Sequence, residues 1–346
     1  MNAETIRLDH LSIGYEGTKH RNSRIVLNDL CAAIRSGELT CLLGVNGAGK
    51  STLLRTLAAF QPGLEGKVLI QGKELKEYTT KQLSQTIGVV LTERCDVRNL
   101  SVYELVALGR APYTGFWGLL SQEDKNIVEK AIDRVGIRPL AARMVHTLSD
   151  GERQKAMIAK SLAQDTPVIL LDEPTAFLDY PSKVEIMQLL HRLSHTMNKT
   201  IFLSTHDVEL AMQLADRLWL MAPQHPLCTG VPEDLILDGT LARYFLRNEE
   251  MAFDADTVTF RAKCPCQQAI RLKGKGIEYT LVQRALMRNG IRAERDITAS
   301  YNIEIIKTDP ASSYYLIHAP HCPPVAAQSI EELIENVKTS IKNQMA

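Results

Sequence analysis

The residues with the clearest capacity for chemistry lie in one segment, Gly44-Val-Asn-Gly-Ala-Gly-Lys-Ser-Thr52. Glycines let backbone N–H groups turn inward around an anion, and a helix that begins there adds its positive end. Lys50 can reach the β- and γ-phosphates of a nucleotide, and the Ser51 hydroxyl can bind Mg²⁺. Apolar residues 39–43 and the helix-like run 53–60 supply the strand and helix that such a loop requires.

This pattern predicts a nucleotide site rather than a glycine-rich turn that matches by chance, because all eight positions are present in context. The predicted nucleotide-binding residues of the loop are Gly44, Asn46, Gly47, Ala48, Gly49, Lys50, Ser51 and Thr52.

Two carboxylates and a histidine follow later apolar strands. Asp172 and Glu173 come directly after the run 168–171, and His206 follows the strand at 200–204. Sites of α/β proteins form at the carboxyl ends of buried parallel strands. One carboxylate there can hold Mg²⁺ and the other can polarise an attacking water, while the histidine could contact a γ-phosphate. Taken singly, a solvated turn and a structural histidine are the ordinary alternatives.

Two further residues have a structural and a functional interpretation. Ser149 in Leu148-Ser-Asp-Gly-Glu152 is followed at capping-box spacing by Glu152, so a helix cap is its simplest explanation. Tyr15 lies about thirty residues before the glycine loop and could stack on a purine. An aromatic residue packed in a sheet is an equally ordinary explanation for it.

Composition narrows the classes of protein. The 346 residues are 45% hydrophobic, which allows a sizeable core in one large and one small domain. The 40 basic and 40 acidic residues cancel, which argues against nucleic acid as a partner. No apolar run approaches the ~20 residues of a membrane span, and the first residues lack signal-peptide character. We therefore expect a cytosolic protein with reduced thiols that can dock on a membrane protein.

Strand and helix patterns alternate along the first 250 residues. The predicted strands are 4–15, 25–27, 30–34, 66–72, 89–91, 168–171, 200–204 and 217–221, and the predicted helical regions are 53–60, 101–146, 149–162, 181–196 and the stretch after 208. The aromatic segment 109–117 is either a packed helix connection or a contact for a partner.

Together these motifs resemble the ATP-binding subunits of ABC transporters. The resemblance covers about residues 4–247 and rests on the order and spacing of the glycine loop, the Ser149 segment, Asp172-Glu173 and His206. It implies an α/β P-loop NTPase with a RecA-like core, an antiparallel β subdomain and a helical subdomain at about 95–165. The ATP-binding domain is then 1–250, followed by a small C-terminal α/β extension, 251–346.

The resemblance also implies roles for individual residues. Tyr15 would stack on adenine, Gly44 to Thr52 would be the Walker A loop, and Asp172 the Walker B carboxylate. Glu173 would be the catalytic base and His206 the switch histidine. The implied ligands are ATP and Mg²⁺.

A second copy of the chain is implied as well. Ser149 and Gly151 resemble the signature segment, which contacts the γ-phosphate held by the opposite subunit, and Asp179 resembles the D-loop aspartate. Two ATP molecules would then be sandwiched head to tail between two copies. Hydrolysis would require closure of this dimer, and closure would drive a membrane partner.

Three departures from the family pattern affect these expectations. The signature has Asp150 and Glu152 where Gly and Gln are usual, so a carboxylate lies near the expected triphosphate. Glu93 matches the Q-loop glutamine; it could ligate Mg²⁺ or water but donates no hydrogen bond unless protonated. Val45 replaces a common proline and should matter little.

A finer resemblance concerns the transported cargo. Residues 102–112, with Asp124 and Val128, are similar to ATPases that energise import of iron–siderophore complexes, haem or cobalamin. This implies transmembrane permease subunits, through them a substrate-binding protein, and a peripheral location on the cytoplasmic face of the inner (plasma) membrane. The alternatives are a soluble ABC-type ATPase and a weakly hydrolysing, ATP-dependent regulatory protein.

The extension has its own pattern of strands and helices. Strands are predicted at 257–260, 303–306 and 314–317, and helices at 278–289, ending before Gly290, and at 329–343. Cys264 and Cys266, with His321-Cys322, suggest either structural thiols or a metal site; the Cys-x-Cys spacing departs from usual zinc pairs and favours thiols. These residues match no standard domain that we recognise.

Overall fold

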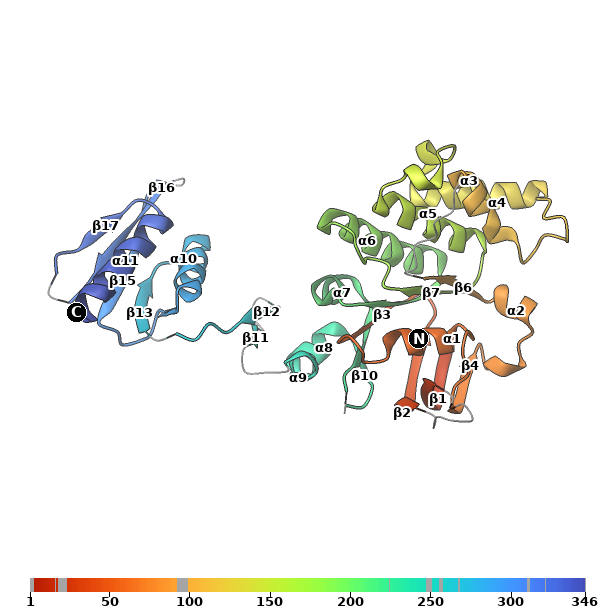
Figure 1. The fold of residues 1–346 in the computed structure, drawn as a ribbon, viewed down its shortest axis with the longest axis horizontal. Helices are drawn as coiled ribbons and strands as arrows, with labels where there is room; N and C mark the ends of the chain where they lie inside the picture. Colours follow the sequence, from red (N-terminus) through yellow and green to blue (C-terminus); the bar gives the residue numbers. More distant parts are fainter. Residues whose placement is uncertain are drawn as a thin grey trace. The chain divides into compact units, whose positions relative to one another are not determined.

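The computed structural model describes residues 3–15, 17, 24–91, 99–223, 225–246, 251–254, 258–266, 268–309, 312–320 and 322–345. The chain divides into two compact units, which are Met1–Arg247 with Phe253–Thr259, and Asn248–Ala252 with Phe260–Ala346 (Figure 1). Within the described ranges, no helix combines the length and the apolar character needed to cross a membrane.

A six-stranded sheet forms the centre of the first unit. Its order is β10-β9-β3-β8-β7-β6, with β3 (Leu39–Gly44), β6 (Ile87–Val90), β7 (Val168–Asp172), β8 (Thr200–Thr205), β9 (Arg217–Met221) and β10 (Cys228–Gly230). All neighbours are parallel except β10, which is antiparallel to β9. Because β3, β8 and β7 are parallel neighbours, their carboxyl ends meet at one edge.

An antiparallel sheet packs beside this core. Its order is β2-β1-β4-β5, with β1 (Glu4–Tyr15), β2 (Arg24–Arg35), β4 (Glu65–Ile70) and β5 (Lys73–Glu74). Helix α1 (Lys50–Leu57) contributes Leu53 and Leu57 to a buried cluster shared by both sheets. The prediction of two strands in 25–34 is wrong, because irregular pairing around Asp29, at φ 55°, lets one strand continue through both segments.

Three helices form the helical subdomain at the top of Figure 1, α3 (Val102–Ala107), α4 (Gln122–Val135) and α5 (Asp150–Ala163). Ser101, Ser121 and Ser149 each begin one of them with a capping box. The predicted helical region 101–146, with its connecting loop at 109–117, corresponds to α3 and α4, but after Val135 the chain up to residue 147 forms only 3₁₀ turns. The chain leaves α3 through a 3₁₀ turn, η2 (Leu108–Arg110), and starts a new helix at the Ser121 cap.

The remaining helices of the first unit are short connections, except for the long helix α6. They are α2 (Thr80–Ser84), α6 (Tyr180–Met197), α7 (Val208–Leu214), α8 (Pro232–Leu237) and α9 (Thr240–Phe245), with 3₁₀ turns η1 (Leu75–Glu77), η3 (Arg138–Leu140) and η4 (Val145–Thr147). Helix α6 confirms the helix predicted at 181–196.

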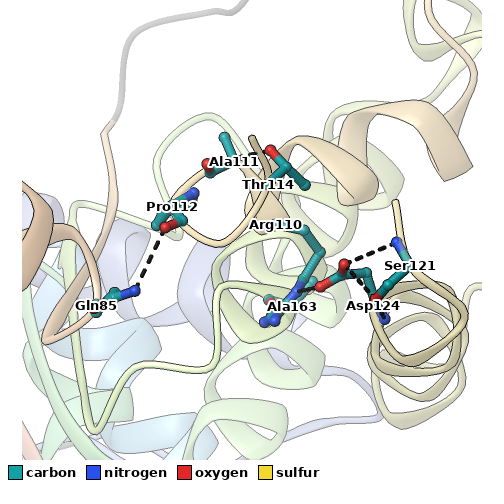
Figure 2. A network of polar contacts seen from close by, with 8 residues as sticks. All are labelled: Gln85, Arg110, Ala111, Pro112, Thr114, Ser121, Asp124 and Ala163. Carbon is teal, nitrogen blue, oxygen red and sulfur yellow. Dashed lines mark hydrogen bonds and ion pairs between the residues drawn. The ribbon is translucent and has the colours of Figure 1, made fainter. Parts of the chain in front are cut away.

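A buried ion pair anchors the segment that follows α3 (Figure 2). The Arg110 guanidinium donates from Nε to Asp124 Oδ1 at 2.8 Å and from Nη1 to the Ala163 carbonyl at 2.9 Å. Asp124 also accepts from the Ser121 hydroxyl at 2.7 Å, and both contacts lower the pKa of its carboxyl. The segment is thereby fixed to α4 and α5 at once.

The second unit has one five-stranded sheet of order β14-β13-β15-β16-β17 and two helices. The strands are β13 (Gln268–Lys273), β14 (Ile291–Glu294), β15 (Tyr301–Asp309), β16 (Ser312–His318) and β17 (Val325–Ala327), and the helices are α10 (Ile277–Arg288) and α11 (Ile330–Met345). Side chains such as Leu272, Leu286 and Val337 form its core. Both predicted helices are confirmed, and Gly290 after α10 has a left-handed φ of 74°.

Strands β13, β14 and β17 were not predicted, because they are short or carry charged residues on one face. A further pair of short strands, β11 (Met251–Asp254) and β12 (Thr259–Ala262), forms its own two-stranded sheet. The parallel pairing of β13 with β14 across α10 makes the second unit a small α/β fold.

Candidate nucleotide-binding site

The glycine loop joins the end of β3 to the start of α1. Gly47 and Gly49 have φ of 79° and 100°, which L side chains rarely adopt. A Cβ on Gly49 would lie 2.6 Å from Val26 Cγ1, and one on Gly44 would lie 2.4 Å from the Met221 carbonyl oxygen. The loop conformation therefore requires glycine at these positions, as its predicted role as an anion nest demands.

Lys50 is held at the mouth of this loop. Its ammonium donates from Nζ to the Gly44 carbonyl at 2.7 Å, and the residue is 6% exposed. Burial lowers its pKa, whereas the carboxylates of Glu173 and Asp172 act in the opposite direction. The structure thus brings the predicted lysine and both predicted carboxylates into one electrostatic neighbourhood.

Hydroxyl groups bind Asp172 at the end of β7. Ser51 Oγ donates to Asp172 Oδ1 at 3.3 Å, and Ser204 Oγ donates to the same oxygen at 2.6 Å. Ser204 Oγ also accepts from the Glu173 backbone N–H at 2.9 Å. A Mg²⁺ ion bonds to oxygens at ~2.0–2.1 Å, so the spacing of Ser51 and Asp172 fits a shared ion with small adjustments.

Glu173 turns out of the strand toward His206. Its backbone has a left-handed φ of 47°, and His206 Nδ1 lies 3.6 Å from its Oε2. Such strain in a residue without glycine's freedom is typical of functional positions. His206 reaches this place because it follows β8, the strand that pairs with β7.

A pocket of about 480 Å³ opens over the loop, within the size range of ligand sites. Its lining combines Asn46, Gly47, Gly49, Lys50, Ser51, Thr52 and Glu173 with Tyr15, Arg24, Ile25 and Val26. Tyr15 is 52% exposed and its hydroxyl lies 3.3 Å from Thr52 Oγ1, so its ring borders the pocket instead of being packed in a core.

Sequence reasoning missed Arg24, Ile25 and Val26 as part of this pocket. They line it because β1 and β2 pair with Tyr15 opposite Arg24 and Gly14 opposite Ile25. A hairpin alignment of the two strands could have found them. Ser204 was also missed as the hydroxyl that orients Asp172, although its place at the end of β8 gave a signal.

The signature residues lie apart from the pocket lining. Ser149 caps α5, and its Oγ accepts from the Glu152 N–H at 3.3 Å, which confirms the capping-box interpretation. Asp179 caps α6 by accepting from the Ser182 N–H at 3.1 Å, and contacts with Ser182 lower its pKa. A Cβ on Gly151 would lie 3.1 Å from Ser182 Oγ, so the starts of α5 and α6 touch.

The two departures near the expected phosphates have different outcomes. The Asp150 carboxylate lies 3.3 Å from Arg153 Nη1, which partly neutralises it. Glu93 lies outside the described residues, as does the segment 92–98 around it. Its matched role therefore stays a prediction.

Comparison with known proteins identifies the family. The family model "ABC transporter" matches residues 27–176. MJ0873 of Methanocaldococcus jannaschii, an uncharacterized ABC transporter ATP-binding protein, is 38% identical over 231 residues, which are 67% of this chain and 78% of the relative. The chain is an ABC transporter ATP-binding protein. The predicted family and fold class are confirmed, and so is its assignment as an ATPase.

Two further similarities concern the cargo and the assembly of related ABC proteins. The iron(3+)-hydroxamate import ATP-binding protein FhuC of Bacillus subtilis is 32% identical over 253 residues, covering 73% of this ABC protein and 92% of FhuC. The solved dimeric structure of MJ0796, a bacterial ABC transporter cassette, superimposes with a TM-score of 0.55 at 27% identity. It covers 63% of this chain and 94% of MJ0796.

The extension also belongs to a described family. The model "Iron ABC transporter C-terminal domain" matches residues 266–338, which corrects our view that the extension matches no standard domain. Within the described parts of the ABC protein, neither cluster of three potential metal ligands includes Cys264, Cys266 or Cys322. His321 lies outside the described residues, so the choice between structural thiols and a metal site stays a prediction.

Proposed function

We propose that this chain drives import of an iron(III) chelate by binding and hydrolysing ATP at the carboxyl edge of its six-stranded sheet. One observation carries the proposal. Lys50, Ser51 and Glu173 line one pocket at the carboxyl ends of the parallel strands β3, β8 and β7. Asp172 accepts a hydrogen bond from Ser51, and His206 lies 3.6 Å from Glu173. These are the charges needed to hold a triphosphate and to activate water beside it.

Each residue has a proposed task in hydrolysis. The loop N–H groups and Lys50 bind the β- and γ-phosphates, and Tyr15 stacks on the adenine ring. Ser51 and Asp172 hold Mg²⁺, which when bound neutralises phosphate charge. Glu173 accepts a proton from the attacking water, and His206, 3.6 Å away, orients that carboxylate and the γ-phosphate.

A second copy of the chain supplies the other half of the site in this proposal. Ser149, Gly151 and Asp179 are not among the pocket-lining residues, although the family resemblance gives the first two a γ-phosphate contact. The dimeric MJ0796 cassette supports an arrangement in which each copy completes the other's site. Glu93 is proposed as a further ligand of Mg²⁺ or water.

The aromatic segment after α3 is proposed to dock on permease subunits, through which a substrate-binding protein delivers the cargo. Phe116 and Trp117 are 96% and 83% exposed and stack edge to face at 5.5 Å. Exposed aromatic pairs of this kind mark contact surfaces. The segment before them is tied to the core by a hydrogen bond that Gln85 Nε2 donates to the Pro112 carbonyl at 3.4 Å (Figure 2). Docking there would place the protein at the cytoplasmic face of the inner membrane.

The iron chelate is proposed from two similarities. FhuC carries iron(3+)-hydroxamate import in its name, and the C-terminal family is described as that of iron ABC transporters. Haem and cobalamin are the competing cargoes. Uptake of radiolabelled iron(III)-hydroxamate and of cobalamin by vesicles that contain the permease would distinguish them, and transport of cobalamin alone would overturn the iron assignment.

The function itself is tested by ATP turnover with and without the permease. Glu173→Gln is expected to lower turnover by ~1,000-fold, because the amide accepts no proton, and to accumulate an ATP-bound dimer. Glu209→Gln, an exposed change on α7, is the matched control. Ordinary turnover in Glu173→Gln would contradict the proposal. Weak turnover of the unaltered protein even with permease would favour a regulatory protein.

A further inference from the structure

Three side chains with metal-binding groups meet at the opposite edge of the sheet from the glycine loop. His191 and His195 are one turn apart on α6, and Asp216 immediately precedes β9. One ligand atom from each lies within 4.8 Å of the other two. The i, i+4 spacing puts both imidazoles on the same face of the helix, as in helical zinc sites.

The carboxylate is already oriented by the backbone. His195 Nε2 lies 3.1 Å from both Oδ1 and Oδ2 of Asp216. Asp216 Oδ2 accepts from the Leu39 N–H at 2.7 Å. Ligating carboxylates are characteristically fixed by such outer hydrogen bonds.

An ordinary ion pair explains His195 and Asp216 but leaves His191 unexplained. Its ring lies 4.4 Å from that of His195, centroid to centroid. Among the side chains that the structure describes, no hydrogen bond reaches the His191 imidazole, although the residue is only partly exposed. A cation shared by the three groups would give this imidazole a partner between the two tilted rings.

We propose that His191, His195 and Asp216 bind a divalent transition-metal ion of the zinc class. Two imidazoles and one carboxylate form a set that Zn²⁺ accepts at ~2.0–2.2 Å, with water in the remaining position. Small rotamer changes would bring each of the three ligand atoms to that distance from one shared ion. All three residues lie in the first unit.

The location makes the ion a stabilising cross-link and not part of the ATP site. Leu39 begins β3 and Asp216 precedes β9, whereas the phosphate loop follows the other end of β3 at Gly44. A six-residue strand spans ~20 Å, so the ion would lie about that far from the phosphates. Binding would tie the last turns of α6 to the start of the sheet.

The test is calorimetric titration of ZnCl₂ into the full-length protein after removal of metals by a chelator under reducing conditions. The unaltered protein is expected to bind one equivalent that both His191→Ala and His195→Ala weaken by at least ~10-fold. Zinc should raise the melting temperature of the unaltered protein by ~2–4 °C and of neither variant. ATP binding should be the same in all three, which shows that the variants fold.

Two controls separate this site from other ligands. His225→Ala removes an exposed histidine outside the cluster, and Cys31→Ser disables the exposed cluster of His10, Asp29 and Cys31. Neither should remove the equivalent that depends on His191. The proposal would be overturned if neither His191→Ala nor His195→Ala changed the zinc affinity. It would also be overturned if Cys31→Ser abolished zinc binding while both histidine variants retained it.

Discussion

The two halves of the nucleotide site differ in how one chain builds them. The loop half gathers Lys50, Asp172 and His206 at one sheet edge, where parallel strands force their carboxyl ends together. The signature half consists of helix starts, where Ser149 and Asp179 cap α5 and α6. Each signature residue already has a structural task, whereas the loop half has charges and an open pocket.

In the proposed dimer, one chain therefore supplies only half of each ATP site. Sheet topology alone assembles the phosphate-binding half, so it should bind nucleotide without help. In the proposed dimer, the signature half would meet a triphosphate held by the other copy. In one chain, Ser149 and Asp179 instead accept hydrogen bonds from the open N–H groups of their own helices.

Loss of the loop charge should have the largest effect. Lys50→Ala removes the ammonium at the loop mouth and should reduce ATP turnover by ~1,000-fold, because a preorganised charge on the phosphates is lost. Nucleotide binding measured by fluorescence of a labelled ATP should fall with it. Lys81→Ala, an exposed lysine on α2, should change neither. Normal nucleotide binding by Lys50→Ala would contradict the assignment of phosphate binding to the loop half.

Altering the signature half should spare binding and damage turnover. Ser149→Asp keeps a good helix cap but places a negative charge toward the partner's triphosphate, so turnover should fall ~100-fold while a single copy still binds ATP. Ser101→Asp makes the same change at the cap of α3 and should have little effect.

Mixing the two inactive variants tests whether each ATP site is shared between two copies. A mixed dimer of Lys50→Ala and Ser149→Asp contains one site in which both contributing halves are intact, because the two copies are related by two-fold symmetry. Turnover should return to about a quarter of normal in an equal mixture if sites act independently. Absence of any recovery would argue against a site shared between copies.

The helical subdomain should depend on its buried ion pair. Asp124→Asn should lower the free energy of unfolding by about 2 kcal/mol, because Arg110 keeps its buried place without a charged partner. Asp133→Asn breaks an exposed pair with Arg138 and should cost less than ~1 kcal/mol. Urea denaturation measures both, and equal losses would contradict the buried-pair argument.

The same ion pair predicts how the free energy of unfolding changes with pH. The pKa of Asp124 is lowered in the folded protein by Ser121 and Arg110. Its stabilising contribution is therefore present above the unfolded pKa of ~3.9 and is lost as the pH falls through the lower folded value. Asp124→Asn should flatten this acid-side loss in urea titrations at decreasing pH.

Neutralising Asp150 should have the smallest effect. Asp150→Asn removes a carboxylate that Arg153 already pairs at 3.3 Å, so KM for ATP should fall only ~3-fold at low salt. Glu123→Gln, in the first turn of α4, is the control. A rise in KM would show that this carboxylate assists the partner's nucleotide.

Sequence reasoning predicted the loop half well and its surroundings less well. The glycine spacing, the apolar runs before Gly44 and Asp172, and the helix caps are local, so the strands, helices and most site residues could be read directly. The continuous strand through Asp29 depends on a bulge, and the short strands of the second unit depend on their neighbours. Local pattern carries no signal for either.

From the sequence alone, a nucleotide-binding loop, two carboxylates and a histidine could be assigned to the ends of strands. This was possible because apolar runs and the glycine spacing are local patterns that mark where a strand ends and which groups follow it. Only tertiary structure decided which strands are neighbours. That order placed His206 3.6 Å from Glu173, added Ile25 and Val26 to the pocket and brought Asp216 to His195. Contacts between distant segments depend on hydrogen-bond pairing and on packing of a shared core, neither of which any single segment encodes.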